Sequence, residues 1–65
     1  MNLYTEIIAD GLEVTPQEAE QIKDFIFNWF DDFRFNSATK LQIIRTAKEA
    51  QTMMKDPRYA ELLEA

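Results

Sequence analysis

The sequence predicts an all-α protein, a small bundle of three to four helices folded as a single domain over residues 1–65. Apolar residues recur at spacings of three and four along most of the chain, as they do on helices with one buried face. Candidate caps, two prolines and the only glycine stand at the ends of these periodic segments. No apolar-polar alternation is long enough for a strand. The expected helices cover about 2–10, 16–34, 37–55 and 57–64.

The first predicted helix begins at Asn2, whose side chain can accept a hydrogen bond from a free amide of the first turn. We expect this helix to end at Gly11, because a left-handed residue at a helix C-cap is most often glycine. Its apolar positions are Leu3, Tyr4, Ile7 and Ile8.

The second predicted helix carries the clearest start signal of the chain. Thr15 and Glu18 have the spacing of a capping box, and Pro16 suits the first helical position because no amide is needed there. At about 100° per residue, one arc of this helix is apolar and consists of Ala19, Ile22, Phe25, Ile26, Trp29, Phe30 and Phe33. A continuous apolar arc is typical of a core-facing helix, so we expect Trp29 to be buried.

Phe27 lies outside that apolar arc, close to Glu20 and Asp31 on the helical wheel, and should be exposed unless another helix or subunit covers it. An exposed aromatic side chain among carboxylates is a candidate contact residue. The predicted partner-binding residues are therefore Glu20, Asp24, Phe27 and Asp31.

The third predicted helix is capped by Asn36 or Ser37 and has a narrower apolar face of Ile43, Ile44, Ala47, Ala50 and Met54. It must end before Pro57, because the residue preceding a proline is pushed out of helical geometry. Asp56 and Pro57 can then begin the fourth helix as cap and first residue, with Tyr59, Leu62 and Leu63 as its apolar positions.

Charge is distributed unevenly along the chain, whose net charge is −5. Residues 1–33 hold eight acids and one lysine, a net of −7, whereas residues 34–58 hold six cations and two acids, a net of +4. This asymmetry suits head-to-tail contact between the two halves of the chain, between copies of the chain, or with a partner of mixed charge. A hydrophobic content of 46% in so short a chain further predicts a homodimer that buries the excess apolar surface.

The competing prediction is DNA binding by the third helix, with Lys40, Arg45 and Lys48 as the contact residues. Residues 25–51 could form a helix, a short joint and a second helix, which is the order of a helix-turn-helix. Two observations count against it: no glycine stands in the turn, and a net charge of −5 opposes binding to a polyanion. Nucleic acid is therefore the alternative partner.

Catalytic and metal-binding functions are not expected. The chain has no histidine, no cysteine and no glycine-rich loop, so the commonest general base, soft nucleophile and phosphate cradle are all missing. Windows starting at Asp10, Asp31 or Asp32 do not match a calcium loop. No cofactor or metal is predicted.

The chain also lacks a long apolar run and a secretory signal, so we expect no membrane span and a cytoplasmic location. The predicted function is that of a small acidic non-catalytic protein that takes part in protein–protein interaction or regulation. Its size and acidity suit a protein encoded by a phage or mobile element. The predicted partner is a basic protein.

Overall fold

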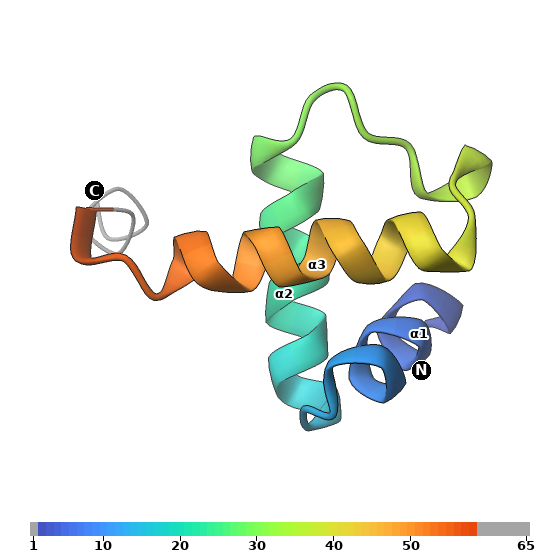
Figure 1. The fold of residues 1–65 in the computed structure, drawn as a ribbon, viewed down its shortest axis with the longest axis horizontal. Coiled ribbons are helices and arrows are strands. Elements are labelled where there is room, and N and C mark those ends of the chain that lie inside the picture. Colours follow the sequence, from blue (N-terminus) through green and yellow to red (C-terminus); the bar gives the residue numbers. More distant parts are fainter. Residues whose placement is uncertain (1, 59–65) are drawn as a thin grey trace.

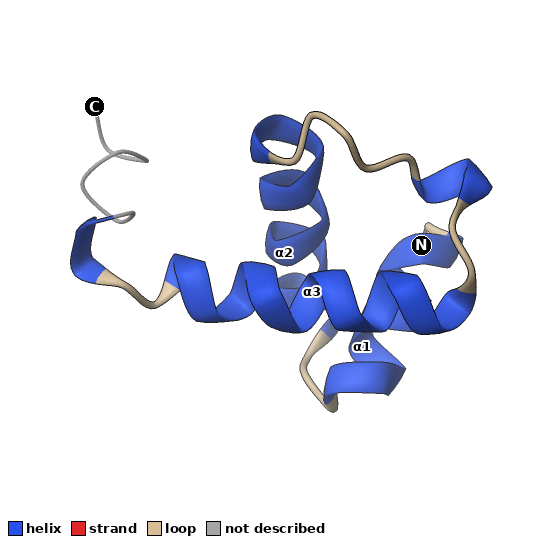
Figure 2. Ribbon diagram, turned by 45° about the horizontal axis from the view of Figure 1, so that its top comes forward, coloured by secondary structure: helices blue, strands red, loops and turns tan. Residues whose placement is uncertain are grey.

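A computed structural model describes residues 2–58 as three α-helices and one short 3-10 helix (Figure 1). The helices are α1 (Leu3–Leu12), α2 (Pro16–Trp29), η1 (Phe35–Ser37) and α3 (Lys40–Met54). Each α-helix packs against the other two, and α3 crosses α2. Figure 2 shows no strand in the described part of the chain. The predicted all-α bundle is confirmed.

The first helix starts as predicted but ends later. Asn2 caps it, since its Oδ1 accepts a hydrogen bond of 2.7 Å from the amide of Tyr4. The prediction that Gly11 forms the left-handed C-cap is wrong: Gly11 lies inside α1, and Glu13 takes the left-handed conformation with φ 55°. Gly11 serves packing instead, because a Cβ atom there would lie 2.5 Å from Cγ1 of Ile44 on α3.

The second helix begins at Pro16, as expected, and the Thr15 hydroxyl accepts a hydrogen bond of 3.2 Å from the amide of Glu18. It ends at Trp29 and not near residue 34, because Phe30 leaves helical geometry (φ −104°, ψ 80°). Phe33 therefore lies in the connection that follows the helix and not on its apolar arc.

The connection between α2 and α3 covers residues 30–39 and contains η1. It is longer than the short joint that the helix-turn-helix alternative assumed. The prediction that Asn36 or Ser37 caps α3 is also wrong, because Thr39 does so in a capping box with Gln42. The Gln42 amide donates to Thr39 Oγ1 at 3.1 Å, and the Thr39 amide donates to Gln42 Oε1 at 2.9 Å. These two bonds set the start of α3 at Lys40.

The third helix ends at Met54, one residue before the predicted end. Asp56 then acts as predicted for a cap, since its Oδ1 accepts a hydrogen bond of 3.0 Å from the amide of Arg58. Apart from its first two residues, the fourth predicted helix, with its apolar positions Tyr59, Leu62 and Leu63, lies outside the described residues.

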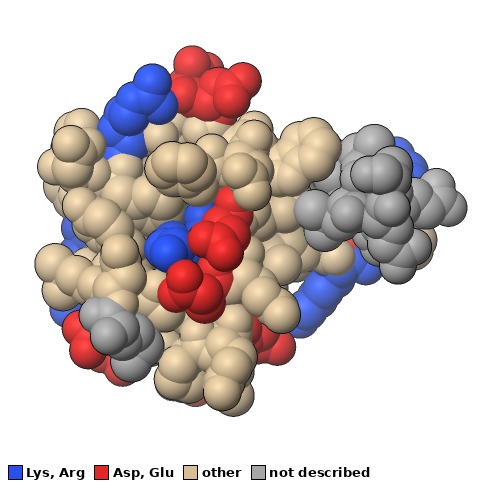
Figure 3. All heavy atoms as spheres, turned by 180° about the vertical axis from the view of Figure 1, so that it is seen from behind, with Lys and Arg blue, Asp and Glu red and all other residues tan. Residues whose placement is uncertain are grey.

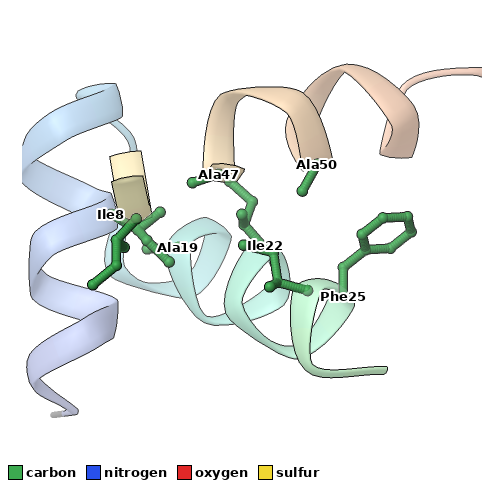
Figure 4. Packing of buried hydrophobic residues seen from close by; sticks show 8 residues of the cluster. Ile8, Ala19, Ile22, Phe25, Ala47 and Ala50 are labelled. Atoms are coloured by element: carbon green, nitrogen blue, oxygen red, sulfur yellow. The ribbon is translucent and has the colours of Figure 1, made fainter. Parts of the chain in front are cut away.

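The hydrophobic core lies where the three α-helices meet. Its buried apolar residues are Ile8, Ala19, Ile22, Phe25, Ile26, Ile43, Ala47 and Ala50. Figure 4 shows Ala47 and Ala50 of α3 beside Ile22 and Phe25 of α2. The small alanine side chains allow the two helices to approach closely.

The prediction that Trp29 is buried is wrong, because 45% of its surface is exposed. Trp29 is the last residue of α2, and its ring is tilted against that of Phe25 with the centroids 6.2 Å apart. An aromatic residue at a helix end needs a further element to cover it, and the predicted continuation of the helix to residue 34 is absent.

Candidate protein-binding groove

An open groove of about 660 Å³ lies between the start of α1, the second half of α2 and the connection that follows α2. We call it the aromatic groove. It is lined by Asn2, Tyr4, Lys23, Phe27, Phe30, Asp31, Phe33, Arg34, Phe35 and Asn36. Five of these ten residues are aromatic, and the volume is within the range of known binding pockets.

Three of the rings hold one another in place. Tyr4 of α1 stacks on Phe35 with the ring centroids 4.9 Å apart, and Phe33 meets Phe35 edge to face at 5.0 Å. Such aromatic pairs add to the stabilisation given by buried area alone. Through the contact of Phe35 with Tyr4, the connection packs against α1. Residues 33–35 are therefore held at α1 and do not continue the second helix.

Phe27 differs from these rings because 77% of its surface is exposed, the largest value among the large apolar residues described. The prediction that it lies outside the core is confirmed. It lines the groove together with Asp31, which is exposed in the turn after α2. The structure thus brings together two of the four predicted partner-binding residues at one groove.

The other two predicted residues, Glu20 and Asp24, are held beside the groove by Lys23. The Lys23 ammonium donates to Glu20 Oε1 at 2.8 Å and lies 3.6 Å from Asp24 Oδ1. Glu20 Oε2 also accepts a hydrogen bond of 2.8 Å from the buried hydroxyl of Thr5 on α1. In Figure 3, acidic side chains lie next to a basic one near the middle of the rear face of the molecule. The acidic surface is therefore partly neutralised.

Sequence reasoning missed most of the groove. It did not predict Tyr4, Arg34 or Phe35 as residues of the site, and it did not predict that Lys23 pairs with Glu20 and Asp24. A usable signal was present, because six of the eight aromatic residues fall between residues 25 and 35. The Arg34 guanidinium donates to the backbone carbonyls of Asp31 at 2.7 Å and Phe33 at 3.3 Å, and so stabilises the turn that carries the groove wall.

The pKa values of Glu20 and Lys23 move apart. The hydrogen bond from Lys23, followed by the one from Thr5, lowers the pKa of Glu20 below its ordinary value. The hydrogen bond to Glu20 raises the pKa of Lys23. Both shifts favour the charged pair, which joins the start of α1 to α2 through Thr5.

These shifts predict how stability depends on pH. Because the pKa of Glu20 is lower in the folded than in the unfolded state, its contribution is present above the unfolded pKa and is lost as pH falls through the folded pKa. We expect Glu20→Gln to lower the melting temperature at neutral pH. As the pH falls, the melting temperature of this variant should decrease less than that of the wild type. Thermal melts across the carboxylate range measure both effects.

The control for that experiment is Glu49→Gln, which alters an exposed carboxylate in the middle of α3 that forms no ion pair within residues 2–58. Its melting profile should follow that of the wild type. Equal profiles for the wild type and Glu20→Gln would show that the hydrogen bonds to Glu20 do not contribute to stability.

The basic residues of the DNA-binding alternative lie elsewhere. Lys40, Arg45 and Lys48 are all exposed on α3, and none lines the aromatic groove. Lys40 lines a separate pocket together with Glu6 and Asp10 of α1. None of the three cations forms an ion pair with any of residues 2–58. The basic and the acidic candidate residues therefore belong to separate surfaces.

Within residues 2–58, no group of three or more histidine, cysteine, aspartate or glutamate side chains is arranged to hold a metal ion. In the same part of the chain, no helix has the length and apolar character needed to cross a membrane. Comparison of the chain with protein-family models, curated proteins and solved structures gives no match. The geometry of the groove is therefore the basis for a functional proposal.

Proposed function

We propose that this protein is a small, non-catalytic, cytoplasmic interaction protein that regulates a basic partner protein by binding it at the aromatic groove. The observation that carries the proposal is the 77% exposed ring of Phe27 at a groove lined by four further aromatic residues. Aromatic side chains are enriched in the centres of protein interfaces, where a few residues contribute most of the binding energy.

The carboxylates beside the groove support a basic partner, although the groove lining itself holds two cations, Lys23 and Arg34, and one acid, Asp31. Asp24 and Asp31 are exposed, and the net charge of the chain is −5. Carboxylates beside an apolar anchor accelerate the approach of a positively charged surface. The partner segment that fits best has one apolar side chain for the groove and lysine or arginine residues beside it.

The proposal is tested by capturing the partner from the native host and measuring its binding rates. Phe27→Ala should raise the dissociation rate about 30-fold, the equivalent of about 2 kcal/mol for an anchor residue. Asp24→Asn combined with Asp31→Asn should slow association and reduce its salt dependence. The free energy of unfolding of both variants should lie within about 0.5 kcal/mol of the wild-type value, because these side chains are exposed.

Glu18→Gln provides the matched control, since it removes one exposed charge from the opposite side of α2. Glu20 is left unchanged in these variants because its bonds to Thr5 and Lys23 support the fold. Wild-type affinity in both the Phe27 and the aspartate variants would refute the proposed site.

DNA binding through α3 is the second candidate, favoured by the exposure of Lys40, Arg45 and Lys48 without ion pairs to residues 2–58. Electrophoretic mobility with random duplex DNA separates the two candidates. A DNA-binding protein must show retardation that weakens with salt and that is lost when the three cations are replaced by glutamine. The acidic interaction protein should show no retardation.

Self-association remains a prediction. The exposed apolar side chains Leu3 (65%), Phe27 (77%) and Leu41 (63%) support it, because their burial between copies would remove apolar surface from water.

A further inference from the structure

Two rows of side chains on α2 and α3 have the same spacing and opposite charge, and all of their residues are exposed except Glu20, which is half-buried. The acidic row consists of Glu20, Asp24 and Phe27 on α2, and the basic row consists of Leu41, Arg45 and Lys48 on α3. In each row the residues stand at i, i+4 and i+7, so they share one side of the helix. Each row holds two like charges and one large apolar residue, Phe27 or Leu41, exposed by 77% and 63%.

We propose that the basic surface bound at the aromatic groove belongs to a second copy of this chain, whose basic row on α3 lies antiparallel along the acidic row although each copy has a net charge of −5. This inference rests on the proposed function, because it names the partner of the same site. It makes the protein a head-to-tail self-associating module.

The direction follows from the order of residues in the two rows. The first and last residues of each row are seven positions apart, or about 10.5 Å at 1.5 Å per residue. Antiparallel packing matches three pairs: Leu41 with Phe27, Arg45 with Asp24, and Lys48 with Glu20. Parallel packing would set the apolar residue of each row against a charge of the other. Only the antiparallel direction places Leu41 at the groove beside Phe27.

The charges of both rows are available for such contact. Arg45 and Lys48 form no ion pair within residues 2–58. The side chains of Glu20 and Asp24 are 47% and 61% exposed although Lys23 contacts both. A second cation can therefore approach each carboxylate from solvent.

The two rows lie on opposite sides of the molecule. Each row stands on the side of its helix away from the buried residues of that helix, and Figure 1 shows that α3 crosses in front of α2. A two-fold axis pairs one patch with the same patch, whereas contacts between two different patches lead to open chains or rings. Each copy would therefore use its acidic row on one neighbour and its basic row on another.

Sedimentation of the wild type and of two complementary variants tests the inference. The acidic-row variant is Asp24→Asn with Phe27→Ser, and the basic-row variant is Arg45→Glu with Lys48→Glu. At low salt the mass of the wild type should rise with concentration beyond two chains, and added salt should reverse this. Each variant alone should self-associate at least about tenfold more weakly and sediment near the 7.7 kDa of one chain.

Mixing the two variants provides the decisive measurement. Each retains the row that the other lacks, so an equimolar mixture should form a complex of two chains and grow no further. Glu49→Gln, an exposed change on α3 outside the basic row, should behave as the wild type. Circular dichroism and thermal melts establish that every variant is folded.

Three results would overturn the inference: a monomeric wild type at high micromolar concentration, a closed dimer that persists in the basic-row variant, or no complex in the mixture. A monomeric wild type that still captures a host protein through Phe27 would refute this inference alone. A monomeric wild type that captures no partner would refute the proposed function as well.

Discussion

Phe25→Ala should lower the melting temperature of this protein much more than Trp29→Ala does. Phe25 is only 4% exposed, and its ring lies 6.2 Å from the rings of both Trp29 and Phe30. Removing a buried phenylalanine side chain costs about 3 to 5 kcal/mol. At roughly 0.05 to 0.15 kcal/mol per residue, a chain of this length has roughly 3 to 10 kcal/mol of stability in total.

Trp29→Ala is the matched control for this prediction, because it removes a larger ring one helical turn away that is 45% exposed. Circular dichroism melts measure both variants, and each kcal/mol should shift the melting temperature by about 4 to 8 °C in a domain of this size. Equal damage from the two substitutions would show that Trp29 is buried in solution, for example against a second copy.

Gly11→Ala should destabilise the protein although it replaces glycine inside a helix. In an unobstructed helix this change stabilises by roughly 0.5 to 1 kcal/mol. Here the new Cβ would lie 2.5 Å from Cγ1, 2.8 Å from Cδ1 and 3.2 Å from Cγ2 of Ile44. Such overpacking costs about 1 to 3 kcal/mol. We therefore expect the free energy of unfolding, measured by urea-induced unfolding, to be lower than that of the wild type.

Ile44→Ala tests the cause, because it removes all three of the side-chain atoms that the new methyl group would meet. The double variant should be more stable than the sum of the two single costs predicts, since the residues are in contact. A higher melting temperature for Gly11→Ala would show that α1 and α3 can separate slightly without loss.

The sequence alone determined the starts of the first two helices and the buried side of the second. Asn2 and Thr15 cap helices through hydrogen bonds to amides two and three residues away, so the information is local. Ala19, Ile22 and Ile26 are buried as the helical period predicts. The exposure of Phe27 follows from the same period.

Only the tertiary structure decided where the second helix ends, why Gly11 is glycine and what the candidate site contains. The stack of Tyr4 on Phe35 and the contact of Gly11 with Ile44 join residues far apart in the chain. The hydrogen bond from Thr5 to Glu20 likewise connects two helices and turns a predicted surface acid into a structural one. Contacts of this kind depend on how helices are placed in space, and helical periodicity describes only one helix at a time.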